Sequence, residues 1–270
     1  MIVPSRSSNY RLVISGNTVE AYIFENGIGY NLKLDKRKRE YYSRTDNPQI
    51  HSSAINRTRN NVIRVTNSNA YKWFDDKNKP YKPQFITYTF AENITDVTHA
   101  NECYTNYIKR LNYHTHKTKK SLLKYIAVIE FQKRGAVHYH TIFFNLPEID
   151  EEKERETREF AEIWNHGFIQ IVPLYSHNAG FYMAKYMTKD LLDKRLLGRR
   201  RYFCSKNLKR PIIIYRPHQT KELILKLQSI KKPDRLDKYE SSITGESHHA
   251  VFELTDEELQ EAFCEYNLGI

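Results

Sequence analysis

The feature that most constrains the fold of this chain is the stretch at residues 126–145, which reads IAVIEFQKRGAVHYHTIFFN. Two runs rich in β-branched and aromatic residues flank a Lys-Arg-Gly sequence at 133–135, a pattern typical of a β-hairpin. Glycine belongs at the last position of a three-residue turn, so we predict a loop at 133–135 that places Glu130 opposite His138. A two-residue loop would instead set Glu130 opposite Tyr139, on the other face of the sheet.

The predicted hairpin brings two imidazoles and a carboxylate to one face. Side chains alternate along a strand, so His138 and His140 point the same way, with Glu130 beside them. Nitrogen and oxygen ligands of this kind suit a divalent metal, Mg²⁺ or Mn²⁺, and would also accept Zn²⁺. The alternative is a pair of strand histidines that bond to their neighbours, next to a surface glutamate.

A second motif lies on a helix predicted over residues 181–189, FYMAKYMTK. Tyr182, Lys185, Tyr186 and Lys189 are spaced i, i+3, i+4 and i+7, so they form one stripe. Tyrosine is a weak nucleophile at neutral pH because its pKa is ~10. The two lysines would favour the phenolate or position a phosphate, and a nearby metal could polarise the electrophile. The alternative is an ordinary amphipathic helix with solvated lysines and half-buried tyrosines.

Together these motifs resemble those of one superfamily of DNA-nicking enzymes. The His-Tyr-His run at 138–140 resembles the histidine-hydrophobic-histidine motif of the HUH endonucleases. The run at 182–189 is similar to the Tyr-x-x-Lys-Tyr-x-x-Lys motif of their two-tyrosine replication initiators, found in single-stranded-DNA phages and plasmids. The order of the motifs is that of replication initiators, whereas conjugative relaxases have the reverse order. Strand 85–90 is similar to the first motif of the family, and segment 198–211 is like one that follows the tyrosine helix.

The resemblance implies a metal-assisted attack on a scissile phosphate. Glu130 would join His138 and His140 as the third metal ligand. Tyr182 or Tyr186 would attack, leaving a 5′-phosphotyrosine and a free 3′-OH, and the other tyrosine would act at termination. The resemblance does not rank the two tyrosines.

The order of predicted elements indicates an α+β fold. Strand 85–90, a helix at about 95–117, the hairpin, a helix ending near 164 and strand 168–174 give the pattern strand, helix, strand, strand, helix, strand. This is the ferredoxin-like split βαβ plan, with an antiparallel sheet. The resemblance implies the same core, with the metal site on the central strands and the tyrosine helix packed beside it.

Composition points to a polyanionic partner. The net charge is +11, and the 20 tyrosines interleaved with basic residues suit stacking on unpaired bases. The three cysteines lie far apart and predict reduced thiols in a cytoplasmic protein. We find neither a signal peptide nor an apolar run long enough to span a bilayer.

The predicted organisation has three parts. Residues 1–80 would be a basic extension, with a small β-meander that turns at Asn17 and Asn26-Gly27. Residues 81–232 would be the nuclease domain. Residues 233–270 would be an acidic C-terminal tail, because residues 240–270 hold no lysine or arginine.

The tail allows several roles. A short amphipathic helix capped by Thr255 could dock on the body, recruit a host protein or compete with DNA. A solubilising tail is the alternative.

Two basic runs are the predicted contacts to the DNA backbone. Their alternative is a solvated basic face. The candidate DNA-binding residues are Lys36, Arg37, Lys38, Arg39, Arg199, Arg200, Arg201, Lys206, Lys209 and Arg210.

The functional prediction is a strand-specific nickase that starts rolling-circle replication on single-stranded or hairpin origin DNA. The chain has no G-x-x-x-x-G-K-[ST] loop, so host helicase and polymerase are implied partners. The alternatives are an HUH transposase and a non-catalytic DNA-binding regulator of replication. The sequence does not choose between a monomer and a dimer.

Overall fold

The computed structural model describes residues 6–30, 48–147, 154–174, 179–186, 193–196 and 199–266. These residues fold into two compact units, one from the described parts of 1–45 and 210–270 and the other from those of 46–209. This division differs from the predicted boundaries at residues 81 and 233. The two ends of the chain fold together through strand pairs such as Thr18 with Glu253, which are 235 residues apart. A pairing over that distance leaves no local pattern in the sequence.

The central unit is built on an antiparallel sheet in the order β6-β3-β5-β4-β7. From β3 to β6 the elements alternate as predicted, and the fold class is α+β. In chain order the elements are α2 (Pro48–Asn67), β3 (Gln84–Phe90), α3 (Val97–His116), β4 (Tyr125–Phe131), β5 (Val137–Phe143), α4 (Glu154–Trp164), β6 (Gly167–Pro173), α5 (Ala179–Lys185), a 3-10 turn at Lys194–Leu196 and β7 (Tyr202–Cys204).

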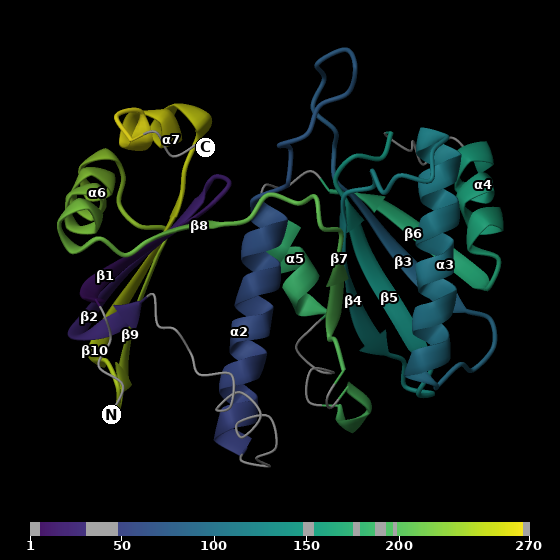
Figure 1. Cartoon of the computed structure of the whole chain (residues 1–270), viewed down its shortest axis with the longest axis horizontal. Coiled ribbons are helices and arrows are strands. Elements are labelled where there is room, and N and C mark those ends of the chain that lie inside the picture. Colours follow the sequence, from purple (N-terminus) through teal and green to yellow (C-terminus); the bar gives the residue numbers. More distant parts are fainter. Residues whose placement is uncertain are drawn as a thin grey trace. The chain divides into compact units, whose positions relative to one another are not determined.

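Helices cover both faces of this sheet (Figure 1). Tyr88 and Tyr139 are fully buried on the face covered by α3 and α4. Phe85 and Val128 are buried on the opposite face, against α2 and α5. Because successive strand residues alternate faces, each strand supplies both cores, which explains why β3 to β5 are apolar almost throughout.

Helix α3 begins and ends as its sequence indicates. The side chain of Asp96 caps it by accepting a hydrogen bond from the Thr98 backbone N–H at 2.8 Å, and it ends at Lys117, whose φ is 52°. The buried Asn112 then ties the following loop to the helix, since its Oδ1 accepts from the backbone N–H groups of Leu122 and Leu123. None of the helices within the described ranges is both long and apolar enough to cross a membrane.

The other unit has its own antiparallel sheet, in the order β8-β1-β2-β10-β9. A single core joins the sheet to its two helices, with Leu12, Val19, Leu223, Phe252 and Phe263 among its buried members. Its elements are β1 (Arg6–Ser15), β2 (Thr18–Tyr30), β8 (Ile212–Ile214), α6 (Pro217–Ile230), β9 (Arg235–Ser241), β10 (Gly245–Glu253) and α7 (Asp256–Phe263).

The acidic C-terminal residues are a folded part of this unit, which corrects the prediction of a tail. Strand β10 pairs with β2, and Leu259 and Phe263 of α7 are buried in the core. The predicted cap is confirmed: Thr255 accepts from the backbone N–H of Glu258, and the Glu258 carboxylate accepts from the backbone N–H of Thr255. The acidic residues of α7 lie on its outer face, so the charge pattern hid the apolar stripe that folds the segment.

The predicted turn at Asn26-Gly27 is wrong. Strand β2 continues to Tyr30, with a shift of register opposite Asn9. The Asn9 side-chain amide donates to the carbonyl oxygens of Phe24 and Glu25, each at 2.9 Å, so the irregular stretch keeps its hydrogen bonds. Residues 31–34 of the predicted third strand lie outside the described residues.

Candidate metal and tyrosine site

The hairpin that opens the site has the predicted register. The backbone N–H of Gln132 donates to the Ala136 carbonyl at 2.9 Å, and Gly135 takes a φ of 88° at the last loop position. Glu130 is therefore paired with His138, on the same face of the sheet. The three-residue loop is confirmed, and with it the meeting of the carboxylate and the imidazoles.

Glu130, His138 and His140 form a compact group, called here the His/Glu cluster. One ligand atom from each residue lies within 4.8 Å of the others. The carboxylate Oε2 of Glu130 is 2.5 Å from Nε2 of His140, and the two imidazole rings are 6.1 Å apart between centroids. Within the described ranges, no other set of three or more histidine, cysteine or acidic residues comes together in this way.

The environment of the histidines fits a metal ion. Nε2 of His138 is buried without any hydrogen-bond partner among the described residues, so it is a lone pair or N–H with an unmet need. Burial, followed by the neighbouring His140, lowers the pKa of His138 to about 4, which keeps the imidazole neutral as a metal ligand must be. The Thr87 hydroxyl lies 3.1 Å from Nδ1 of His140, which leaves Nε2 of that ring facing the cluster. The cluster can therefore hold a divalent metal.

Both predicted tyrosines reach this cluster from α5 and the turn that follows it. The ring of Tyr186 stacks on His140 with centroids 4.0 Å apart and an interplanar angle of 29°. The Tyr186 hydroxyl donates to the Tyr182 hydroxyl at 3.3 Å, and both rings contact Phe85. The predicted neighbourhood of metal site and tyrosines is thus present in the structure.

The electrostatics around Tyr186 favour its neutral form. Burial raises the pKa of Tyr186, and the hydrogen bond to Tyr182 and the charge of Glu130 raise it further. A phenol in this setting is a poor nucleophile by itself, so a reaction through it needs a positive charge or a base nearby. A cation in the His/Glu cluster would meet that need and would offset the charge of Glu130.

Helix α5 is seated by two residues that the sequence analysis did not single out. A Cβ added to Gly180 would lie 2.5 Å from the backbone oxygen of Ile63 and 2.5 Å from Oδ1 of Asn67. The same Asn67 oxygen accepts from the Gly180 backbone N–H at 2.9 Å. Only glycine allows α5 to approach α2 this closely, and this contact fixes where Tyr182 and Tyr186 lie. A glycine directly before the tyrosine motif was the available signal.

The remaining catalytic predictions are placed in part. Lys185 is exposed at the end of α5, with its Nζ 5.6 Å from the centre of the Tyr182 ring. Lys189 and the basic run Lys36–Arg39 lie outside the described residues.

The second basic run does not form a single patch. Arg199, Arg200 and Arg201 precede β7, the edge strand next to β4. Lys206 is exposed after β7, whereas Lys209 lies 5.6 Å from the Trp73 ring. Arg210 is the first residue of the chain's return to the other unit.

The central part of the chain matches known proteins. A family model for replication-associated proteins of the ORF2 type matches residues 83–191. A curated relative, the replication-associated protein ORF2 of Spiroplasma virus 4, is 30% identical over 131 residues. The segment is similar to replication-associated proteins. The family match contains β3 to α5, and hence the His/Glu cluster and both tyrosines.

The reach of these matches is partial. The alignment with the viral protein covers 43% of this chain and 41% of the relative's length. No solved structure matches the chain.

Proposed function

We propose that this chain is a replication initiator of the HUH type, which nicks one DNA strand at an origin. The observation that carries the proposal is the contact between Tyr186 and His140: a nucleophile of the required kind lies against a ligand of the His/Glu cluster. The similarity of residues 83–191 to replication-associated proteins supports the same reading.

The residues of the cluster would hold Mg²⁺ or Mn²⁺ against a non-bridging oxygen of the scissile phosphate. Bound there, the metal would stabilise the negative charge that develops on the phosphate. Glu130 and the two imidazoles contribute their lone pairs, and Thr87 holds the His140 ring in the ligating orientation.

The tyrosine then carries the covalent step. The phenolic oxygen of Tyr182 or Tyr186 attacks phosphorus, its proton leaves, and the bond from phosphorus to the 3′ oxygen breaks. The products are a 5′-phosphotyrosine and a free 3′-OH, which a host polymerase can extend after a host helicase opens the duplex. The energy of the broken bond is kept in the new ester, so the second tyrosine can rejoin strands at termination.

Basic residues around the site would hold the DNA. Lys185 and Lys189 would position a phosphate or support the phenolate. Arg199 to Arg201 and Lys206 would grip the backbone of a single-stranded or hairpin origin, with Lys36 to Arg39 as further contacts. This work would take place in the cytoplasm.

The test is a denaturing gel of the protein with labelled single-stranded DNA from its own replicon, in Mn²⁺ or in EDTA. A metal-dependent covalent adduct is expected, and it should be lost in His140→Ala and in the double variant Tyr182→Phe with Tyr186→Phe. Tyr113→Phe, at an exposed tyrosine outside the site, is the matched control and should form the adduct normally. DNA binding without an adduct in any metal would instead favour the non-catalytic regulator.

A further inference from the structure

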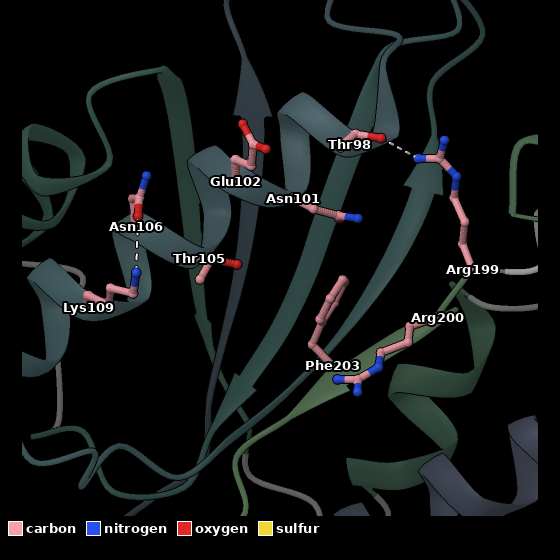
Figure 2. A pocket seen from close by; sticks show the side chains of 9 residues that line it. All are labelled: Thr98, Asn101, Glu102, Thr105, Asn106, Lys109, Arg199, Arg200 and Phe203. Carbon is pink, nitrogen blue, oxygen red and sulfur yellow. Dashed lines mark hydrogen bonds between the residues drawn. The ribbon is translucent and has the colours of Figure 1, made fainter.

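A hollow of about 570 Å³ lies between α3 and the segment that leads into β7 (Figure 2). It is on the opposite face of the sheet from the His/Glu cluster. Phe203 packs toward Tyr139 in the α3 core, whereas its neighbour Tyr202 bonds to Asn61 of α2. The hollow is lined by Thr98, Asn101, Glu102, Thr105, Asn106, Lys109, Arg199, Arg200 and Phe203.

The walls of this hollow offer an aromatic face and an oriented amide. The Phe203 ring rises from β7 toward α3, and the Asn101 side chain points from α3 into the same space (Figure 2). Oδ1 of Asn101 accepts from the Tyr139 hydroxyl at 2.7 Å, so the amide is held in one orientation. Its NH₂ group has no hydrogen-bond partner among the described residues, and its two donors remain available to a ligand.

Two guanidinium groups lie at the rim. Arg199 is held by a 2.7 Å hydrogen bond to the Thr98 hydroxyl, which keeps it beside the opening (Figure 2). Arg200 is exposed and makes neither a hydrogen bond nor an ion pair with any described residue. A planar ring, an amide donor and two arginines together match the base and the phosphate of a nucleotide.

The size of the hollow supports this assignment. Its volume falls within the range of about 300–1,000 Å³ that small-molecule sites have. The carboxylate of Glu102, also on the lining, can accept a hydrogen bond from the amino group of a base. A lipid or an acidic peptide would leave the stacking face or the Asn101 donors without a partner.

A second hollow indicates that the nucleotide belongs to a strand. This second space, of about 550 Å³, shares Arg199, Arg200 and Phe203 with the first and continues past Tyr202 to Thr58 of α2. Within the described residues β7 pairs only with β4, so it is an edge that a chain of nucleotides can cross. Two adjoining spaces that share their cations suit successive nucleotides better than one free nucleotide.

We infer that the hollow between α3 and β7 binds one unpaired nucleotide of the DNA strand, stacked on Phe203 and hydrogen-bonded by Asn101, at a place remote from the cleaved phosphate. This inference rests on the proposed function only in taking DNA as the ligand. It adds a site where the protein reads a base on the face opposite the nuclease chemistry.

The test measures binding of the full chain to fluorescent single-stranded DNA in EDTA, by anisotropy. The probe is a set of strands in which each base in turn is replaced by an abasic residue. Wild-type protein should lose affinity at one position, by about tenfold, the order expected when one stacked base is lost. Phe203→Leu, which keeps an apolar side chain, and Asn101→Asp, which keeps the acceptor for Tyr139, should bind the intact strand as weakly as the wild type binds that abasic strand.

Controls separate this result from charge effects and from the nickase proposal. Asn78→Asp makes the same chemical change at an exposed position whose φ of 59° tolerates aspartate, and it should bind as the wild type does. Equal binding by the wild type, Phe203→Leu and Asn101→Asp would overturn the inference, and so would displacement of the strand by free dATP at equal concentration. Because EDTA is present throughout, a failure of metal-dependent nicking leaves this result unaffected, and the reverse also holds.

Discussion

The ring of Tyr186 lies against the ring of His140, 4.0 Å away between centroids, while Nδ1 of His140 faces Thr87 and Nε2 faces Glu130. One imidazole therefore touches the carboxylate, the supporting hydroxyl and the tyrosine at once. The tyrosine is packed on a metal ligand, and Tyr182 reaches that ligand only through Tyr186 and Phe85. This arrangement ranks two tyrosines that the sequence motif leaves equivalent.

We therefore predict that Tyr186 makes the first attack. Tyr186→Phe keeps the stacked ring and removes the nucleophilic oxygen, so formation of the initial adduct should fall on the order of 100-fold or more. Tyr182→Phe should reduce it far less, because the oxygen nearest the cluster remains. Mass spectrometry of the peptide that carries the DNA identifies the residue, and an adduct mainly on Tyr182 in the wild type would contradict the ranking.

Thr87 should act as a positioning residue for the metal. Thr87→Val removes the hydroxyl beside Nδ1 of His140 without changing the shape of the side chain, and the ring loses the partner that fixes its tautomer. Loss of such a partner typically weakens metal binding about 10–100-fold. Titration calorimetry with Mn²⁺ measures the change. Thr87→Ser keeps the hydroxyl and should restore the affinity; equal affinities in all three proteins would show that the hydroxyl has no such role.

Metal should stabilise the fold through His138. At a free Mn²⁺ concentration 100 times its dissociation constant, binding to the native state adds about 2.7 kcal/mol to the free energy of unfolding. The wild type should therefore melt at a higher temperature in Mn²⁺ than in EDTA, and His138→Ala should lose this difference. His114→Ala changes a histidine outside the cluster and should keep it. A Mn²⁺-induced shift that survives in His138→Ala would place the metal elsewhere.

Local patterns were enough to predict the core of the central unit. The turn residue Gly135 fixed the register of the hairpin, and alternation then determined that Glu130, His138 and His140 share a face. Helix periodicity likewise aligned Tyr182 with Tyr186. These features depend on neighbours in the sequence, where glycine conformation and side-chain spacing decide the outcome.

The rest depended on contacts between distant segments. Nothing near Asn67 indicates that its oxygen accepts from Gly180, 113 residues away, and so seats the tyrosine helix. The acidic composition after residue 240 suggested a tail, although β10 pairs with β2 near the other end of the chain. Charge describes the surface of a segment and says little about the alternate residues that it buries.

Gly180 should be intolerant of a side chain. A methyl group there would meet the Ile63 carbonyl and the Asn67 side chain at 2.5 Å, so Gly180→Ala must move α5 away from α2. We expect a loss of about 1–3 kcal/mol in the free energy of unfolding of the central unit, with impaired adduct formation, because Tyr186 shifts with the helix. Urea unfolding followed by fluorescence measures the first effect. Gly27→Ala is the control, since the nearest atom to its added Cβ would be 3.5 Å away; equal stability of the two variants would refute the close approach.

The C-terminal helix should be needed for the unit that joins the chain ends. Thr255→Ala removes the oxygen that accepts from the Glu258 backbone N–H and leaves that donor at the helix start unmet. The expected cost is about 0.5–2 kcal/mol, and Thr255→Ser should restore most of it because serine caps equally well. Hydrogen exchange of the backbone amides in β10 and α7 reports on this unit separately from the nuclease unit. Faster exchange should appear in both elements of the alanine variant, since Phe252 of β10 and Phe263 of α7 share one core. Exchange confined to the first turn of α7 would mean that the helix contributes little to the fold of the sheet.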